Sequence, residues 1–157
     1  MECESKTILV IEDDMDQLSA ARGYFETKGN NMIYATTYDE ARKYIPTKFC
    51  KPESKVDGVI SDVYFPLSTH REWNQEEPIG VRVAIELSAA GIPFVLNTAG
   101  YHHGRKYAWI DQLAKNQGWV LIDSGDDSNH EEDSSSKNWQ LAYEVLNKQI
   151  DETTKGK

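Results

Sequence analysis

Short apolar runs alternate with segments of helical periodicity five times along the chain, and this alternation constrains the fold more than any other feature. The runs are rich in Ile, Leu and Val, as in strands that are buried on both faces. Between them, apolar residues recur three and four positions apart, which predicts helices. The predicted strands cover residues 8–11, 32–35, 56–61, 92–96 and 119–122, and the predicted helices cover residues 15–28, 38–45, 81–90, 107–117 and 139–150.

This order of strands and helices predicts an α/β fold, in which a parallel sheet is covered by helices on both faces. No repeat or shift in composition divides the chain, so we expect residues 1–157 to form a single domain with its core at about 6–150. The polar stretches 67–79 and 123–136 are predicted to be long loops. The residues after Ile150 are predicted to be a polar tail.

Polar residues that suit phosphate and metal chemistry follow three of the predicted strands. Glu12 and Asp13 follow the first, Asp62 ends the third, and Thr98 follows the fourth. The carboxyl ends of parallel strands meet at one edge of a sheet, where ligands of such folds bind. We therefore expect an acidic pocket that can hold a hard cation and place one carboxylate for attack on phosphorus.

Three motifs, taken together, resemble the receiver domains of two-component response regulators. They are Ile-Leu-Val-Ile-Glu-Asp-Asp at residues 8–14, Gly-Val-Ile-Ser-Asp-Val-Tyr-Phe-Pro at 58–66, and Pro-Phe-Val-Leu-Asn-Thr-Ala at 93–99. Their order and their position at successive strand ends are more specific than any one of them. The resemblance implies a flavodoxin-like, doubly wound (βα)5 fold with strand order 2-1-3-4-5, and a stand-alone, atypical member of the family.

The resemblance also implies roles for individual residues. Asp62 would accept the phosphoryl group, and the hydroxyl of Thr98 would donate a hydrogen bond to a phosphoryl oxygen. Mg²⁺ would be held by Glu12, Asp13 and Asp62, together with the backbone carbonyl of Tyr64. Mg²⁺ prefers a few carboxylates plus water, which agrees with this set. The protein would react on its own Asp62 rather than turn over a substrate as an enzyme.

The fifth strand departs from the family pattern. Receiver domains carry a lysine at its end, but residues 118–125 read Gly-Trp-Val-Leu-Ile-Asp-Ser-Gly. Depending on the register, Ile122, Asp123 or Ser124 occupies the position of that lysine. Asp123 there would line the pocket and add negative charge, beside Asp14 and the small Ala99. Lys106 or Lys137 could reach the pocket from elsewhere in the chain, and the sequence does not decide between them.

The expected partners follow from the same resemblance and from the charge. They are a histidine kinase or phosphotransfer protein and a downstream protein target, and the oligomeric state stays open between a monomer and a homodimer. The formal net charge of −9 argues against a nucleic-acid partner, which needs a basic face. No apolar stretch approaches the ~18 residues that span a bilayer, so we expect a cytoplasmic protein with no membrane contact.

Two other functions are compatible with the sequence. The missing strand-five lysine favours a pseudo-receiver, which would bind proteins without being phosphorylated. A metal-dependent phosphohydrolase would instead use a nucleophile and an acid two residues apart after the first strand, and Asp14 and Asp16 have that spacing. A shared fold does not decide among these functions.

Overall fold

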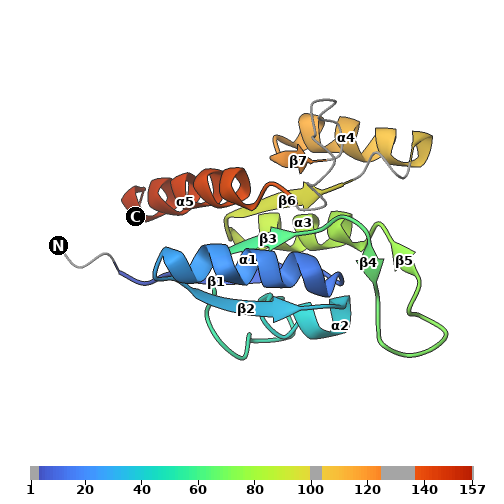
Figure 1. Cartoon of the computed structure of the whole chain (residues 1–157), viewed down its shortest axis with the longest axis horizontal. Helices are drawn as coiled ribbons and strands as arrows, with labels where there is room; N and C mark the ends of the chain where they lie inside the picture. Colours follow the sequence, from blue (N-terminus) through green and yellow to red (C-terminus); the bar gives the residue numbers. More distant parts are fainter. Residues whose placement is uncertain (1–3, 100–103, 125–136, 157) are drawn as a thin grey trace.

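A five-stranded parallel sheet lies between two layers of helices in the computed structural model, which describes residues 4–99, 104–124 and 137–156 (Figure 1). The strand order is β2-β1-β3-β6-β7, which is the expected order 2-1-3-4-5 when the sheet's own strands are counted along the chain. The α/β fold class is therefore confirmed. The sheet strands are β1 Thr7–Ile11, β2 Asn31–Ala35, β3 Gly58–Ser61, β6 Phe94–Thr98 and β7 Leu121–Asp123, and the helices are α1 Met15–Thr27, α2 Tyr38–Ala41, α3 Ile79–Ala90, α4 Arg105–Gln117 and α5 Trp139–Lys155.

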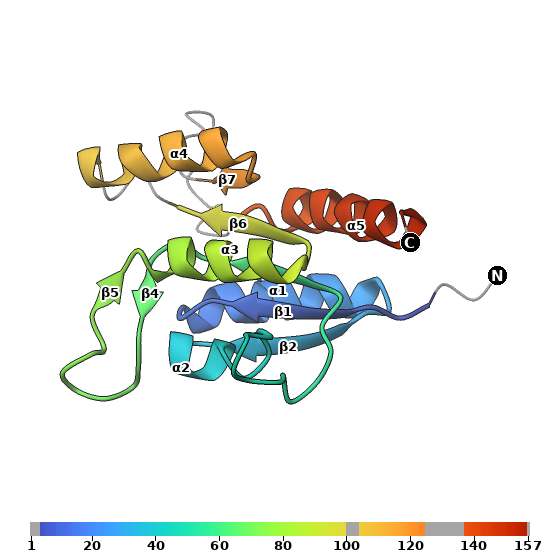
Figure 2. The same ribbon diagram turned by 180° about the vertical axis from the view of Figure 1, so that it is seen from behind.

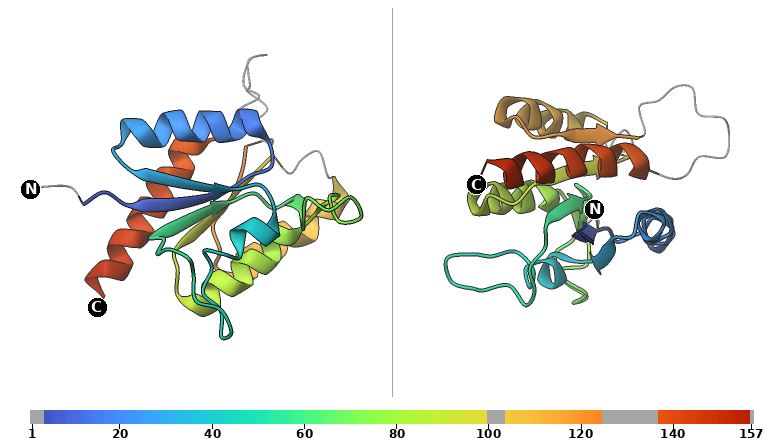
Figure 3. Two further views of the ribbon diagram at one scale, coloured as in Figure 1. Left: turned by 90° about the horizontal axis from the view of Figure 1, so that it is seen from below. Right: turned by 90° about the vertical axis from the view of Figure 1, so that its left-hand side faces the viewer.

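The central strands β1, β3 and β6 divide the core into two halves because successive side chains point to opposite faces. Leu9 and Ile11 face the half that is covered by α2, α3 and α4. Ile8 and Val10 face the half that is covered by α1 and α5. Figure 3 shows α1 and α3 on opposite sides of the sheet. Burial on both faces explains why these strands read as continuous apolar runs.

Local signals in the sequence set the ends of the helices. Asp14 caps α1, and its carboxylate accepts from the backbone N–H groups of Asp16 and Gln17. Gly91 and Gly118 end α3 and α4, with φ of 68° and 70°. Glycine adopts this left-handed conformation without the cost that a Cβ imposes.

Two segments differ from the loops and tail that were expected. Within residues 67–79, Glu76–Glu77 form strand β5, which pairs antiparallel with β4 at Phe65–Pro66. The resulting β4–β5 hairpin projects beyond one end of the sheet (Figure 2). α5 continues to Lys155, so the residues after Ile150 extend the helix. Most of the predicted loop 123–136 lies outside the described residues.

The helices of the described parts of the chain include none with the length and apolar character to cross a bilayer.

Helix α3 begins against the backbone that carries Asp62, and Gly80 permits this close approach. The Gly80 N–H donates to the carbonyl of Val63 at 2.9 Å. A Cβ on Gly80 would lie 2.3 Å from the carbonyl oxygen of Asp62 and 2.7 Å from the Cα of Val63. These neighbours are backbone atoms and cannot turn away as a side chain could. The glycine therefore fixes how closely α3 supports the turn after β3.

We expect Gly80→Ala to lower the free energy of unfolding by roughly 1–3 kcal/mol, because the added methyl group must displace backbone. Gly23→Ala is the matched control. Gly23 lies in α1 with no other atom near its added Cβ, so the same change should raise stability by about 0.5–1 kcal/mol through helix propensity. Urea unfolding of both variants checks this, and equal effects would contradict the close approach at Gly80.

Candidate functional site

Three carboxylates meet at the carboxyl edge of the sheet. Glu12 and Asp13 follow β1, Asp62 follows β3, and the last residues of the two strands, Ile11 and Ser61, are paired in register. One oxygen from each carboxylate lies within 4.8 Å of the others. Glu12 is almost completely buried, with 1% of its surface exposed. The three carboxylates thus lie together at the strand ends, as the sequence led us to expect.

Backbone hydrogen bonds hold these residues by continuing the sheet one residue past each strand. The N–H of Glu12 donates to the carbonyl of Ala35 at 3.0 Å, and the N–H of Asp62 donates to the carbonyl of Ile11 at 2.8 Å. The N–H of Val63 donates to Oδ1 of Asp62 at 2.6 Å. The Asp62 side chain is therefore oriented by its own turn as well as by the sheet.

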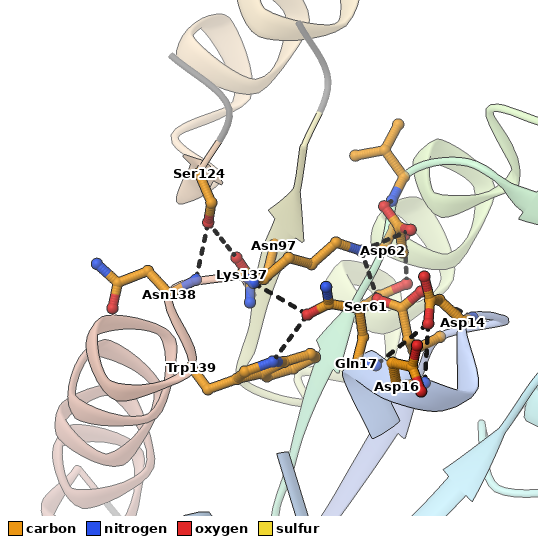
Figure 4. Close-up of polar contacts among 12 residues, drawn as sticks. Asp14, Asp16, Gln17, Ser61, Asp62, Asn97, Ser124, Lys137, Asn138 and Trp139 are labelled. Carbon is orange, nitrogen blue, oxygen red and sulfur yellow. Dashed lines mark hydrogen bonds and ion pairs between the residues drawn. The ribbon is translucent and has the colours of Figure 1, made fainter. Parts of the chain in front are cut away.

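Lys137 supplies the positive charge of the pocket (Figure 4). Its Nζ donates to Oδ2 of Asp62 at 2.7 Å and also contacts Oε2 of Glu12. The lysine is buried, with 8% of its surface exposed. It precedes Asn138, the N-cap of α5, and does not belong to β7, which ends at Asp123 without a lysine. Of the two lysines that the sequence left open, the structure places Lys137 at the carboxylates.

Burial and the crowding of like charge raise the carboxylate pKa values. Burial, followed by repulsion from Asp62, raises the pKa of Glu12 from 4.5 to about 8, although Lys137 opposes the rise. Burial, followed by the charges of Glu76 and Asp62, raises the pKa of Asp13 from 3.8 to about 6. Burial alone would lower the pKa of Lys137, but Asp62 and Glu12 more than offset it, so its pKa is raised. The pocket thus holds a charged lysine and excess negative charge.

Thr98 and Asp123 lie side by side at the next two strand ends. Thr98 ends β6, is 2% exposed, and pairs in register with Asp123 on β7. Ala99 follows Thr98 and is half-buried. Burial and then the charge of Asp123 raise the pKa of Tyr107 on α4. The Asp123 carboxylate therefore lies near α4, whereas Lys137 enters from α5 on the opposite face.

Asp14 and Tyr64, which were also predicted as site residues, both make hydrogen bonds to neighbouring elements or turns. The carboxylate of Asp14 is engaged by the first turn of α1, where it caps the helix at 2.8 Å from the N–H of Asp16. Tyr64 is buried, and its hydroxyl donates to the carbonyl of Lys106 at 3.4 Å. The Tyr64 ring therefore links the turn after β3 to the start of α4. Its backbone carbonyl as a metal ligand stays a prediction.

Sequence reasoning missed two residues near the pocket. Glu76, from the β4–β5 hairpin, lies near Asp13, and its charge is one of those that raise the pKa of Asp13. Gln17, on α1, accepts a hydrogen bond from the backbone N–H of Lys137. Glu76 carried no signal, because strand β5 consists of two glutamates of low strand propensity. Gln17 could have been noticed as a polar residue beside Leu18 on the buried side of α1.

The chemistry of the donor set fits a hard divalent cation. Mg²⁺ takes oxygen ligands and binds through one or two carboxylates while keeping several waters. Glu12, Asp13 and Asp62 offer such oxygens close together. The raised pKa values of Glu12 and Asp13 also mean that a cation would compete with protons for these two carboxylates. The residues present are therefore those that would hold the ion.

No family model matches the sequence, and no curated protein matches it. Solved structures match it over nearly its whole length. A CheY-like response regulator receiver domain protein from Methanospirillum hungatei JF-1 has a TM-score of 0.60 at 16% identity, covering 98% of this chain and 100% of that one. The bacteriophytochrome response regulator AtBRR has a TM-score of 0.54 at 18% identity, covering 92% and 94%.

The chain has the receiver-domain fold. The solved structures therefore confirm the resemblance seen in the motifs at the level of the fold. A crystal structure of an adenylate cyclase from Rhodopirellula baltica also matches, with a TM-score of 0.63 at 16% identity, covering 97% of this chain and 94% of that one. Identities this low establish the fold alone, so activity must be argued from the pocket.

The raised carboxylate pKa values predict that stability falls as pH rises. Between pH 4.5 and about 8, folded Glu12 holds a proton that the unfolded chain has released. The folded state therefore loses its advantage as pH rises through this window, and Asp13 acts in the same direction below pH of about 6. Urea unfolding with a chelator present should show this decline.

Glu12→Gln should flatten the decline at the upper end of that window, since the amide does not titrate. Glu144→Gln, on the exposed surface of α5, should leave the profile unchanged. A free energy of unfolding that rises with pH in the wild-type protein, or an unchanged slope in Glu12→Gln, would contradict the assignment.

Proposed function

We propose that the protein is a receiver-like signalling domain that accepts a phosphoryl group on Asp62 in a Mg²⁺-dependent reaction. The observation that carries the proposal is the contact of the Lys137 ammonium group with Asp62 at 2.7 Å, beside the carboxylates of Glu12 and Asp13. A nucleophile, a cation-binding pair and a fixed positive charge are the parts that phosphoryl transfer to a carboxylate requires.

In the proposed step, a carboxylate oxygen of Asp62 attacks the phosphorus of a phosphohistidine or an acyl phosphate. The new oxygen–phosphorus bond forms as the donor's bond to phosphorus breaks, and the leaving group takes the electron pair. A bound Mg²⁺ supplies positive charge to the phosphoryl oxygens.

Lys137 would act as a point charge on the incoming group. Its ammonium group holds Asp62 and Glu12 together when no phosphoryl group is bound, and it can pair with a phosphoryl oxygen once Asp62 is modified. The Thr98 hydroxyl would donate to another phosphoryl oxygen from the neighbouring strand. Movement of these two groups is the expected origin of the conformational change that a downstream protein reads.

The partners in this proposal are those expected from the motifs. A histidine kinase or phosphotransfer protein would donate the group, and a downstream protein would bind the changed surface. The protein would be modified once per signal on Asp62, so it would be a phosphoprotein rather than an enzyme with a separate substrate. We place it in the cytoplasm, where such donors act.

The reasons for the two alternative functions are weaker in the structure than in the sequence. The pseudo-receiver was favoured by a missing lysine, and Lys137 provides an ammonium group from the residues just before α5. The phosphohydrolase needed Asp14 as a nucleophile with Asp16 as an acid. Asp14 instead caps α1 through the backbone of Asp16. Among the described residues, these contacts favour neither the pseudo-receiver nor the phosphohydrolase.

We expect the wild-type protein, incubated with Mg²⁺ and acetyl phosphate, to gain the mass of one phosphoryl group, because Asp62 is the proposed nucleophile of the pocket. Asp62→Asn should show no gain, since an amide is not a nucleophile toward phosphorus. Asp57→Asn is the matched control, because Asp57 lies at the opposite end of the same strand and accepts a hydrogen bond from Thr7 that asparagine can also accept.

Intact mass spectrometry and peptide mapping measure both outcomes. An equal gain in wild type and Asp62→Asn would overturn the assignment of Asp62. No gain in the wild-type protein with acetyl phosphate, together with no binding of beryllofluoride, would favour the pseudo-receiver over the proposed function.

A further inference from the structure

One side-chain oxygen on α1 accepts two hydrogen bonds from the segment Lys137–Trp139. Oε1 of Gln17 accepts a hydrogen bond from the backbone N–H of Lys137 at 2.9 Å and another from the indole Nε1–H of Trp139 at 3.3 Å (Figure 4). Gln17 and Trp139 are both buried, with 9% and 5% of their surfaces exposed. These two hydrogen bonds join α1 to the start of α5 beside Lys137.

A second attachment comes from the end of β7. The backbone N–H of Asn138 donates to Oγ of Ser124 at 2.9 Å. Asn138 in turn caps α5, since its Oδ1 accepts from the N–H of Leu141 at 3.1 Å. The N-cap of α5 is therefore held by β7, and the preceding Lys137 is held by α1.

These contacts matter because Lys137 does not belong to a sheet strand. The hydrogen-bonded ladder of the sheet positions Glu12 and Asp62, but β7 ends at Asp123. The backbone N–H of Lys137 is instead bonded to a side-chain acceptor, Oε1 of Gln17. A functional group must be held within about 0.5 Å of its working position by such supporting contacts.

We infer that Gln17 is the positioning residue that sets the Lys137 ammonium group against Asp62. The inference deepens the proposed function and rests on it for its effect on phosphoryl transfer. Removing the acceptor would leave two buried N–H groups without their partner, which buried donors do not tolerate well. The start of α5 would then shift to find other acceptors, and the Lys137 ammonium group would move from Asp62.

Gln17→Met tests the inference, because methionine has a similar length and no acceptor of comparable strength. Gln17→Glu restores an oxygen that can accept both N–H groups and serves as the rescue variant. Gln140→Met makes the same chemical change on the exposed surface of α5 and is the matched control. Urea unfolding of each variant verifies that it is folded under the conditions used.

The first measurement separates positioning from cation binding. In Gln17→Met, phosphorylation by acetyl phosphate at saturating Mg²⁺ should be at least about tenfold slower, as when one stabilising donor is displaced. The Kd for Mg²⁺ should not weaken, because Glu12, Asp13 and Asp62 are untouched. Gln17→Glu should recover most of the rate, and Gln140→Met should match wild type.

The second measurement does not require phosphorylation. An amine-acylating reagent should modify Lys137 slowly in wild type, because the ammonium group is buried between carboxylates. Its modification should become several-fold faster in Gln17→Met, relative to exposed lysines of the same sample. Peptide mass spectrometry follows each lysine separately.

The two readouts distinguish the inference from the proposed function. A wild-type protein that is not phosphorylated, with Lys137 becoming reactive in Gln17→Met, would refute the proposed function and support the positioning role. A folded Gln17→Met variant with wild-type phosphorylation and a protected Lys137 would overturn the inference. A loss of rate that Gln17→Glu does not restore, with Lys137 still protected, would also overturn it.

Discussion

The contact of the Lys137 ammonium group with the carboxylates of Glu12 and Asp62 is the interaction on which the acidic pocket depends. Three carboxylates within 4.8 Å of one another repel, and burial makes their ionisation costly. A buried cation offsets both effects, and removing one partner of such a pair costs about 3–5 kcal/mol in typical proteins. The Lys137 contact therefore holds the Asp62 carboxylate in place, while the pocket keeps excess negative charge.

The rest of the structure is arranged around that contact. The sheet brings Glu12 and Asp62 together through adjacent strands, and Gly80 lets α3 pack against the Asp62 turn. Helix α5 begins at the same edge, because helices that follow parallel strands return from their carboxyl ends. Gln17 and Ser124 hold the start of α5, so the lysine reaches the pocket from the α1–α5 face. Side-chain hydrogen bonds, rather than a sheet strand, thus hold the backbone next to the Lys137 side chain.

The fold could be predicted almost completely, because buried strands and glycine-capped helices leave clear patterns, as at β1 and at Gly91. The three carboxylates could also be predicted, since strand ends converge on one edge of the sheet. The origin of the positive charge could not, because Lys137 follows Ser124 only after a long intervening segment. Gln17 and Glu76 act through contacts between elements that are distant in sequence. Such contacts leave no local periodicity to read.

The most direct test of the central claim is the rate of Asp62 phosphorylation by acetyl phosphate in Lys137→Met and Lys106→Met at saturating Mg²⁺. Lys137→Met should be at least about tenfold slower than wild type, because the change removes the cation that would meet the phosphoryl group. Lys106→Met should keep the wild-type rate, since Lys106 is exposed on α4. A wild-type rate in Lys137→Met, or a loss confined to Lys106→Met, would contradict the account.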